Sequence, residues 1–253
     1  MLRAVWSRLV RVRVTVAYAV ALSVVMVTLL VLGPKVRDRV TEYASTNLHN
    51  LARGRIGTLL GSAFVADSDL FYVWLPGLIC LLAAAELLWH WRRVLVVFIT
   101  GHIGATILVA AGLVVAVKAG WLPWSITRAA DVGISYGAMA VTGALTAVVP
   151  ARVKPLWLAW WLSAATAVVA ISSDFTDIGH AIALVLGIVI STRLDSQVHW
   201  TRTRRILFGV GTSFGYLILV HTPELALAGV PASALGAAVV AAVGLLVRRG
   251  PSL

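Results

Sequence analysis

Ser135 is the residue of this sequence whose surroundings best suit nucleophilic chemistry. It lies in residues 131–143, which read Asp-Val-Gly-Ile-Ser-Tyr-Gly-Ala-Met-Ala-Val-Thr-Gly and open an apolar segment. An Asp at a helix start accepts hydrogen bonds from free backbone N–H groups, so we expect Asp131 to begin this helix. Ser135 then lies about 6 Å below the helix start, and the spacing of Gly133 and Gly137 lets a second helix approach closely. These features suit a nucleophile within a membrane. A serine that only assists helix packing is the alternative.

His180 is the residue that could serve as the base for this serine. It lies in the segment Gly-His-Ala-Ile-Ala-Leu-Val-Leu-Gly, residues 179–187. At 100° per residue, Gly179, Ala183 and Gly187 fall within about a quarter turn of His180, so the same helix face permits close packing. A histidine within an apolar span is costly to bury and indicates a functional site. A serine and a histidine on two such helices predict a nucleophile–base pair.

Composition places the chain among polytopic membrane proteins. Of its 253 residues 60% are hydrophobic and 12% are charged, and the mean hydropathy is +0.94. Apolar runs recur along the whole length, so we expect no separate soluble domain. The single Cys80 excludes a disulfide within the chain and a multi-cysteine metal site. We expect no metal and no cofactor. We also expect no nucleic-acid partner, because the net charge of +11 is better explained by its distribution around the membrane.

Eight apolar segments predict the elements that position these residues. The first is too long for a signal-peptide core and lacks a following cleavage site, so we expect a retained anchor. The polar connection 35–69 carries apolar residues at helical spacing, which indicates an amphipathic element in the membrane interface. The predicted transmembrane helices are residues 14–32, 70–89, 94–117, 131–149, 156–171, 178–190, 206–220 and 232–247.

The distribution of basic residues predicts the topology. If residues 1–13 are cytoplasmic, the inner turns and the C-terminal tail carry basic pairs at residues 92–93, 204–205 and 248–249, as the positive-inside rule requires. Both termini are then cytoplasmic. The fourth and sixth helices both enter from the outer face, which puts Ser135 and His180 at nearly the same depth.

The serine segment resembles that of the rhomboid intramembrane serine proteases. That family has a six-helix core, with a catalytic serine on the fourth helix and a histidine on the sixth. Its serine motif reads Gly-x-Ser-Gly, with another glycine eight residues after the serine. Here Gly133, Ser135 and Gly143 match, whereas Tyr136 follows the serine. We expect Gly133 and Tyr136 to bind the oxyanion or support the site; because Tyr136 departs from the motif, it either offers its hydroxyl or crowds the site.

The histidine segment carries the second part of the resemblance. The family's sixth helix reads His-x-x-Gly-x-x-x-Gly, and here His180 and Gly187 match while Ala183 replaces the middle glycine. Glu86, ahead of a basic turn, resembles the junction between the second and third helices. The resemblance covers roughly residues 14–192 and is closest to divergent rhomboid-like proteins of high-GC bacteria.

One departure concerns the oxyanion. In the family a histidine and an asparagine at the outer end of the second helix help to bind it, and loss of one such donor typically costs about 2.7–4 kcal/mol of transition-state stabilisation. Here apolar residues align with those positions, namely Ala66, Phe71 and Leu75. The backbone N–H of Ser135 remains. Possible substitutes from the first loop are Asn47, His49 and Asn50.

Other polar residues in the spans are expected to be structural. We expect packing or hydrogen bonding for His102, an inner-face network with His90 for Glu86, and a surface location for His221. Asp177 is expected to cap the sixth helix, with orientation of His180 as the alternative.

The sequence therefore predicts an all-α polytopic membrane protein with a rhomboid-like six-helix core and two additional C-terminal transmembrane helices. The expected divisions are a basic cytoplasmic N-terminus (1–13), the membrane core (14–192), and a basic inner turn with the two added helices (193–253). Close helix contacts are expected at Gly137, Gly143, Ala183 and Gly187.

The resemblance implies a Ser135–His180 dyad that cleaves membrane-anchored proteins near the outer face of a bacterial plasma membrane. The partners would be the lipid bilayer and the transmembrane segments of other proteins. A catalytically inactive protein that binds transmembrane helices as a scaffold or chaperone is the alternative. A transporter is disfavoured, because the spans lack paired interior charges and broken helices in corresponding halves.

Overall fold

The computed structural model describes residues 9–66, 71–172 and 174–249, and within these ranges the chain is helical without strands. Most of the predicted N-terminal segment 1–13 lies outside the described residues, as does Leu70. The long helices are α2 (Arg13–Leu32), α6 (Phe71–Trp89), α7 (Trp91–Lys118), α9 (Lys154–Ile171), α10 (Phe175–Ser191), α11 (Arg202–Leu219) and α12 (Pro223–Arg249). The shorter elements are α3 (Pro34–Ala44), α4 (Leu48–Ala52), α5 (Thr58–Gly61), α8 (Ser135–Ala144), η1 (Ser62–Phe64), η2 (Trp124–Arg128) and η3 (Leu145–Val148).

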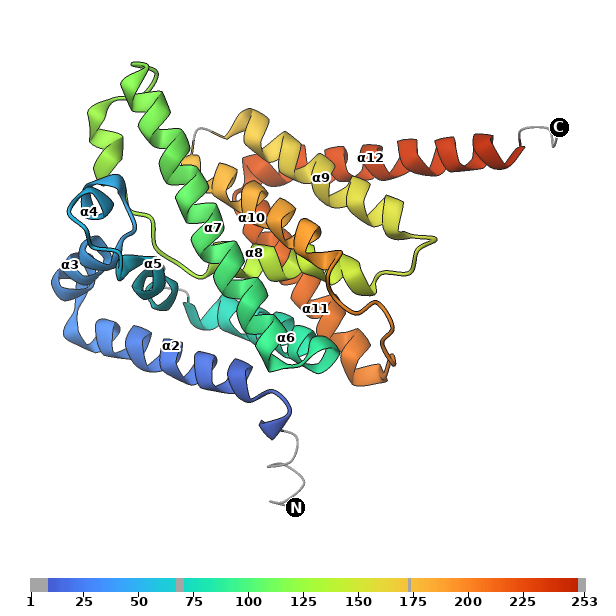
Figure 1. Ribbon diagram of the computed structural model, residues 1–253, viewed down its shortest axis with the longest axis horizontal. Coiled ribbons are helices and arrows are strands. Elements are labelled where there is room, and N and C mark those ends of the chain that lie inside the picture. Colours follow the sequence, from blue (N-terminus) through green and yellow to red (C-terminus); the bar gives the residue numbers. More distant parts are fainter. Residues whose placement is uncertain (1–8, 67–70, 173, 250–253) are drawn as a thin grey trace.

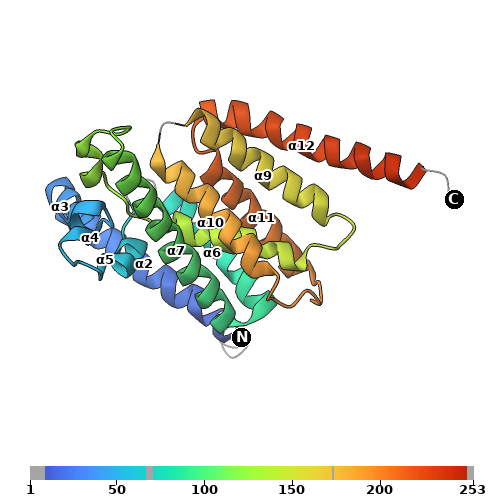
Figure 2. The same ribbon diagram turned by 45° about the horizontal axis from the view of Figure 1, so that its top comes forward.

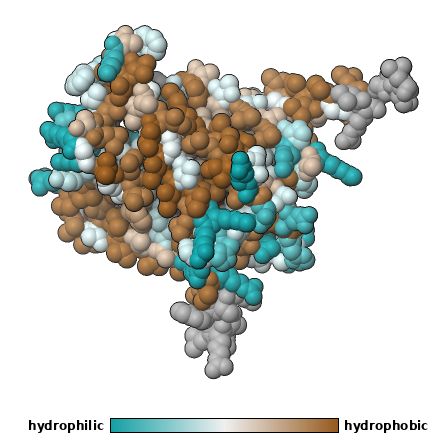
Figure 3. All heavy atoms as spheres, viewed as in Figure 1, coloured by the Kyte–Doolittle hydropathy of each residue, from teal (hydrophilic) through white to brown (hydrophobic). Residues whose placement is uncertain are grey.

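Within the described residues, five helices are long and apolar enough to cross a membrane, namely α2, α6, α7, α9 and the segment Pro223–Leu246 of α12. Of two shorter apolar stretches, Ser135–Val148 lies inside the bundle, whereas Phe175–Ser191 packs against it between α7 and α9 (Figures 1 and 2). Figure 3 shows apolar side chains across the middle of one face, with hydrophilic groups toward its edges. The prediction of an all-α, multi-pass membrane protein is confirmed.

Polar contacts connect the ends of several long helices at one side of the bundle. Buried Glu86, near the end of α6, accepts hydrogen bonds from the backbone N–H of Val14 at 3.0 Å and of Thr15 at 2.9 Å. Arg93 at the start of α7 pairs with Asp195 beyond α10. Glu86 thus has the expected structural role, but its side-chain partners lie in α2 and do not include His90. Glu86 instead satisfies the free N–H groups at the start of α2, which have no intrahelical partners.

Short helices α3, α4 and α5 form a compact first loop at the opposite end of α2 (Figure 1). Asn47 caps α4 by accepting a hydrogen bond from the N–H of Asn50 at 2.9 Å. Asn50 in turn donates to the carbonyl groups of Glu42 and Ser45, at 2.9 and 2.8 Å. These side chains therefore fix the backbone of the loop itself.

The centre of the bundle is a close contact between α8 and α10. A Cβ atom added to Gly187 would lie 2.0 Å from the carbonyl oxygen of Ala140, and one added to Gly143 would lie 2.1 Å from that of Leu184. On the other side of α8, a Cβ at Gly101 of α7 would lie 1.9 Å from Ala140 Cβ. Small residues thus let α8 fit between α7 and α10, where larger residues would hold the backbones apart.

Helices α11 and α12 pack on the outside of this core. Gly211 of α11 lies against the backbone of Leu81 in α6, and Gly77 of α6 lies against the ring of Phe214. Helix α12 lies along α9, where Gly236 meets Ser163, and its C-terminal part extends beyond the bundle in both ribbon views (Figures 1 and 2). It begins at Pro223, earlier than the predicted residue 232, and Pro231 is accommodated within it.

Candidate functional site

Ser135 is the first residue of α8, and the expected start at Asp131 is wrong. The residue that precedes the helix is Ile134, and no side chain caps this end. Asp131 instead belongs to an extended connection, where its N–H donates to Oγ of Ser45 at 2.8 Å and its carbonyl accepts from the N–H of Thr46 at 2.9 Å. These hydrogen bonds with the first loop keep Asp131 in an extended conformation, so the helix begins only at Ser135.

Gly133 shapes the turn that leads into the serine. Its φ of 125° lies in a region that residues with a Cβ rarely adopt. Its N–H donates to the carbonyl of Ser62 at 2.9 Å, so this group is already used and does not act as an oxyanion donor in this conformation. The N–H groups of Ser135 and Tyr136, in the first turn of α8, have no intrahelical carbonyl to bind. They are the better candidates.

His180 lies in the second turn of α10 and is buried, with 7% of its surface exposed. Asp174 caps this helix by accepting from the N–H of Thr176 at 2.9 Å, so the expectation that Asp177 is the cap is wrong. The side chain of Asp177 is instead directed to His180, with Oδ1 3.4 Å from Nδ1 of the ring. This contact is the alternative role considered for Asp177.

One cavity of about 570 Å³ is lined by both Ser135 and His180. Its walls come from α6, the connection before α8, α10 and α11, and they include Trp74, Ser213 and Phe214. No hydrogen bond joins Ser135 to His180 within the described part of the chain. Catalytic contacts are often loose in a free enzyme and tighten in the substrate complex, so their direct contact stays a prediction.

The ring of Tyr136 packs against the ring of His180. The ring centroids of Tyr136 and His180 are 5.6 Å apart at an interplanar angle of 78°, an edge-to-face arrangement. Gly179 leaves room for it, because a Cβ there would lie 2.3 Å from Tyr136 Cζ. The hydroxyl is buried without a hydrogen-bond partner among the described residues. Tyr136 thus packs against the ring of His180.

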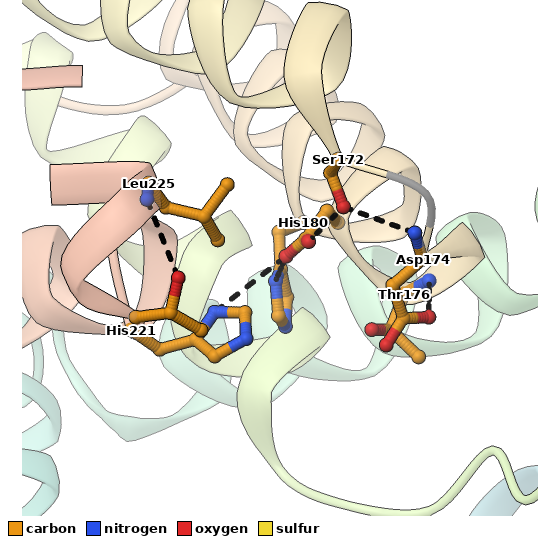
Figure 4. Close-up of polar contacts among 8 residues, drawn as sticks. Ser172, Asp174, Thr176, His180, His221 and Leu225 are labelled. Atoms are coloured by element: carbon orange, nitrogen blue, oxygen red, sulfur yellow. Dashed lines mark hydrogen bonds and ion pairs between the residues drawn. The ribbon is translucent and has the colours of Figure 1, made fainter. Parts of the chain in front are cut away.

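Two residues join this site that the sequence did not assign to it. His221, in the connection between α11 and α12, has its Nδ1 3.6 Å from Oδ1 of Asp177, and it lines the cavity. Ser172 donates to the other carboxylate oxygen of Asp177 at 2.5 Å. Figure 4 shows the rings of His180 and His221 turned toward each other, with dashed lines that meet at one carboxylate. His221 was expected to be only a surface group.

The oxyanion side of the cavity is mainly apolar in the described residues. Helix α6 contributes Val73, Trp74 and Gly77, and Ala66 lies beside them. Asn47 and Asn50 are used within the first loop, and His49 lines a different cavity. The structure therefore brings none of the three possible substitutes to Ser135.

His102 of α7 forms a buried contact with Ser62. Its Nε2 lies 3.1 Å from Oγ of Ser62, which also receives the Thr46 hydroxyl at 3.0 Å. Both His102 and Ser62 are almost completely buried, so this pair links the first loop to α7. The expected packing and hydrogen-bonding role of His102 agrees with this contact.

The comparison with known families agrees with the helical core described above. A sequence model described as "Rhomboid-like protein" matches residues 10–198. The chain therefore belongs to the rhomboid-like protein family. The matched region includes Ser135 and His180 and ends before α11. No curated protein and no solved structure matches this chain.

Proposed function

We propose that this protein is an intramembrane serine protease of the rhomboid type, which cleaves membrane-anchored proteins near the outer face of the membrane. The observation that carries the proposal is that Ser135 and His180 line one cavity, each near the start of an apolar helix. Ser135 Oγ would attack the scissile carbonyl. His180 would accept the proton and return it to the leaving amine.

The surroundings of each residue support this division of roles. Nδ1 of His180 faces the carboxylate of Asp177, which favours the tautomer with its proton on Nδ1 and leaves Nε2 free to accept a proton. The N–H of Ser135 and the positive end of the α8 dipole would stabilise the developing oxyanion. Gly133 holds the turn that aims the serine.

The proposed orientation puts both termini in the cytoplasm of a bacterial cell. The end of the bundle where α2 and α7 begin carries Arg13, Arg92 and Arg93, whereas Asp131, Asp174 and Asp177 lie toward the end that carries Ser135. A basic cytoplasmic side follows the positive-inside rule. We retain residues 14–192 as the core and 193–253 as the addition.

The direct test is labelling with a serine-directed fluorophosphonate. The detergent-solubilised wild-type protein should be labelled, and Ser135→Ala and His180→Ala should each abolish labelling. Ser213→Ala is the matched control, because Ser213 lines the same cavity on α11 and is exposed. Labelling that persists in Ser135→Ala would overturn the proposal.

The second candidate is a non-catalytic protein that binds transmembrane helices. The apolar wall at Ala66 and Val73 favours it, because hydrolysis needs donors for the developing charge. It predicts no labelling of the wild type. It also predicts that a cellular phenotype of deletion is rescued by both Ser135→Ala and His180→Ala.

A further inference from the structure

Asp177, His180 and His221 form a cluster of metal-binding groups at the end of the bundle where α10 begins and α11 ends. One ligand atom from each residue lies within 4.8 Å of the other two. The side chains of Asp177 and His180 are 2% and 8% exposed, whereas that of His221 is 44% exposed. Two of the three groups are thus buried, and the cluster is accessible to solvent on the side of His221.

Its distances suit a small cation. Zn²⁺ binds histidine nitrogen and carboxylate oxygen at about 2.0–2.2 Å, so two ligands of a tetrahedral site are about 3.4 Å apart. Oδ1 of Asp177 lies 3.4 Å from Nδ1 of His180 and 3.6 Å from Nδ1 of His221. Because His221 is half exposed, its ring can adjust to close the remaining distance.

The hydrogen bonding of the cluster points to a missing partner. Oδ1 of Asp177 and Nδ1 of His180 face each other at 3.4 Å, yet both atoms are buried and neither makes a hydrogen bond of regular geometry among the described residues. Buried polar atoms are rarely left in that state. The other oxygen of Asp177 is held by the Ser172 hydroxyl, the type of outer contact that orients a metal-binding carboxylate.

We propose that Asp177, His180 and His221 bind a divalent transition-metal ion, Zn²⁺, from the outer side. Two imidazole nitrogens and one carboxylate oxygen form a donor set that suits zinc. The fourth position faces the exposed side of His221 and is filled by water.

Zinc bound at this site prevents His180 from acting as the general base, a consequence that rests on the proposed function. A metal on Nδ1 of His180 leaves the single ring proton on Nε2. That nitrogen is then a donor and cannot accept the proton of Ser135. Zinc therefore acts as an inhibitor and not as a catalytic cofactor.

Zinc binding is measured by titrating ZnCl₂ into the full chain in detergent, with competition against a fluorescent chelator. We expect one ion per chain and at least a tenfold weaker affinity in His221→Ala. His221→Gln serves as a second variant if His221→Ala does not fold. His199→Ala is the control, because this exposed histidine lies outside the cluster between α10 and α11. No binding to the wild type, or equal affinity in a folded His221 variant, overturns the site.

Fluorophosphonate labelling separates the site from its effect. Zinc should slow labelling of the wild type, and, relative to its own rate without zinc, His221→Ala should be slowed less. Zinc binding by a protein that is never labelled supports the metal site and contradicts the protease. Labelling by a protein that binds no zinc supports the protease and overturns the metal site.

Discussion

Three side chains, from helices α8 and α10 and from the connection after α11, converge on the imidazole of His180. Asp177 faces Nδ1 at 3.4 Å, Tyr136 packs edge-on beneath the ring, and His221 approaches the same carboxylate. A ring held in this way is pre-organised, which matters because a catalytic base must present one particular nitrogen to its nucleophile. His221 is the exposed member of this group, with 44% of its side chain exposed.

Asp177→Asn should slow fluorophosphonate labelling while leaving the protein folded. The amide can still accept from Ser172, but it no longer favours the proton on Nδ1 of His180. Replacing the orienting Asp by Asn in a Ser-His-Asp triad lowers kcat by about 10⁴. Labelling rates across a pH series, measured with a chelator present, provide the test. An unchanged rate and pH profile would remove Asp177 from the mechanism.

A second residue-scale prediction concerns Asp131, which lies in the connection outside the membrane-spanning helices. Burial raises the pKa of its carboxyl from 3.8 to about 6. Well below pH 3.8 the carboxyl is protonated in both the folded and the unfolded chain. As the pH rises from 3.8 toward 6, it ionises in the unfolded chain only, and the free energy of unfolding falls. Above that, the ionised carboxylate costs about 3 kcal/mol of stability, since one pKa unit corresponds to about 1.4 kcal/mol.

Asp131→Asn should therefore raise the melting temperature at pH 8 and have little effect at pH 4. The backbone hydrogen bonds of residue 131 with Ser45 and Thr46 remain in this variant. Thermal unfolding in detergent at the two pH values measures the difference. A variant that melts lower than wild type at pH 8 would mean that the carboxylate is stabilising.

At the scale of elements, the position of α10 depends on glycine backbone contacts. Gly187→Leu should misassemble the protein, because even a Cβ there would lie 2.0 Å from the carbonyl oxygen of Ala140. Overpacking typically costs 1–3 kcal/mol and more where backbone must move. Gly112→Leu in α7 is the matched control, since no atom lies within 4 Å of its added Cβ. Size-exclusion profiles that are equally monodisperse would contradict this account of α8 and α10.

The helices themselves could be predicted, whereas several of their ends could not. Apolar runs identified every long helix, because that signal is local. The start of α8 depends on hydrogen bonds between Asp131 and the first loop, which no local pattern reveals. At α10 two aspartates three residues apart both suit a cap, and the structure uses Asp174.

The same limit applies to the site. Ser135 and His180 could be proposed from their glycine-rich segments and a charge-based topology. His221 could not, because its approach to Asp177 depends on how α11 packs against α6 and not on any spacing in the chain. The one signal in the sequence was that His221 follows the predicted helix 206–220 at the same predicted membrane face as His180.

At the scale of the whole molecule, α11 connects the matched core to the added C-terminal helices. It lies outside residues 10–198, yet Ser213, Phe214 and Leu217 form one wall of the cavity. Gly215 of this helix also contacts Thr142 of α8. The cavity is therefore completed by a part of the chain that the family match does not include.

Removal of residues 199–253 should destabilise the protein and abolish labelling of Ser135. The truncation uncovers the face of α6 against which Gly211 and Phe214 pack, and it opens the cavity to lipid on that side. Burial of apolar surface provides no driving force within a bilayer. The stability lost on truncation therefore comes from close van der Waals contacts between helices, which lipid tails replace poorly. Truncation after residue 241 is the matched control, because residues 241–246 are exposed and the contact at Gly236 remains. Thermal unfolding and labelling of both shortened chains should separate them. If residues 1–198 alone fold and are labelled at the full rate, α11 is dispensable and the catalytic core is complete without its added helices.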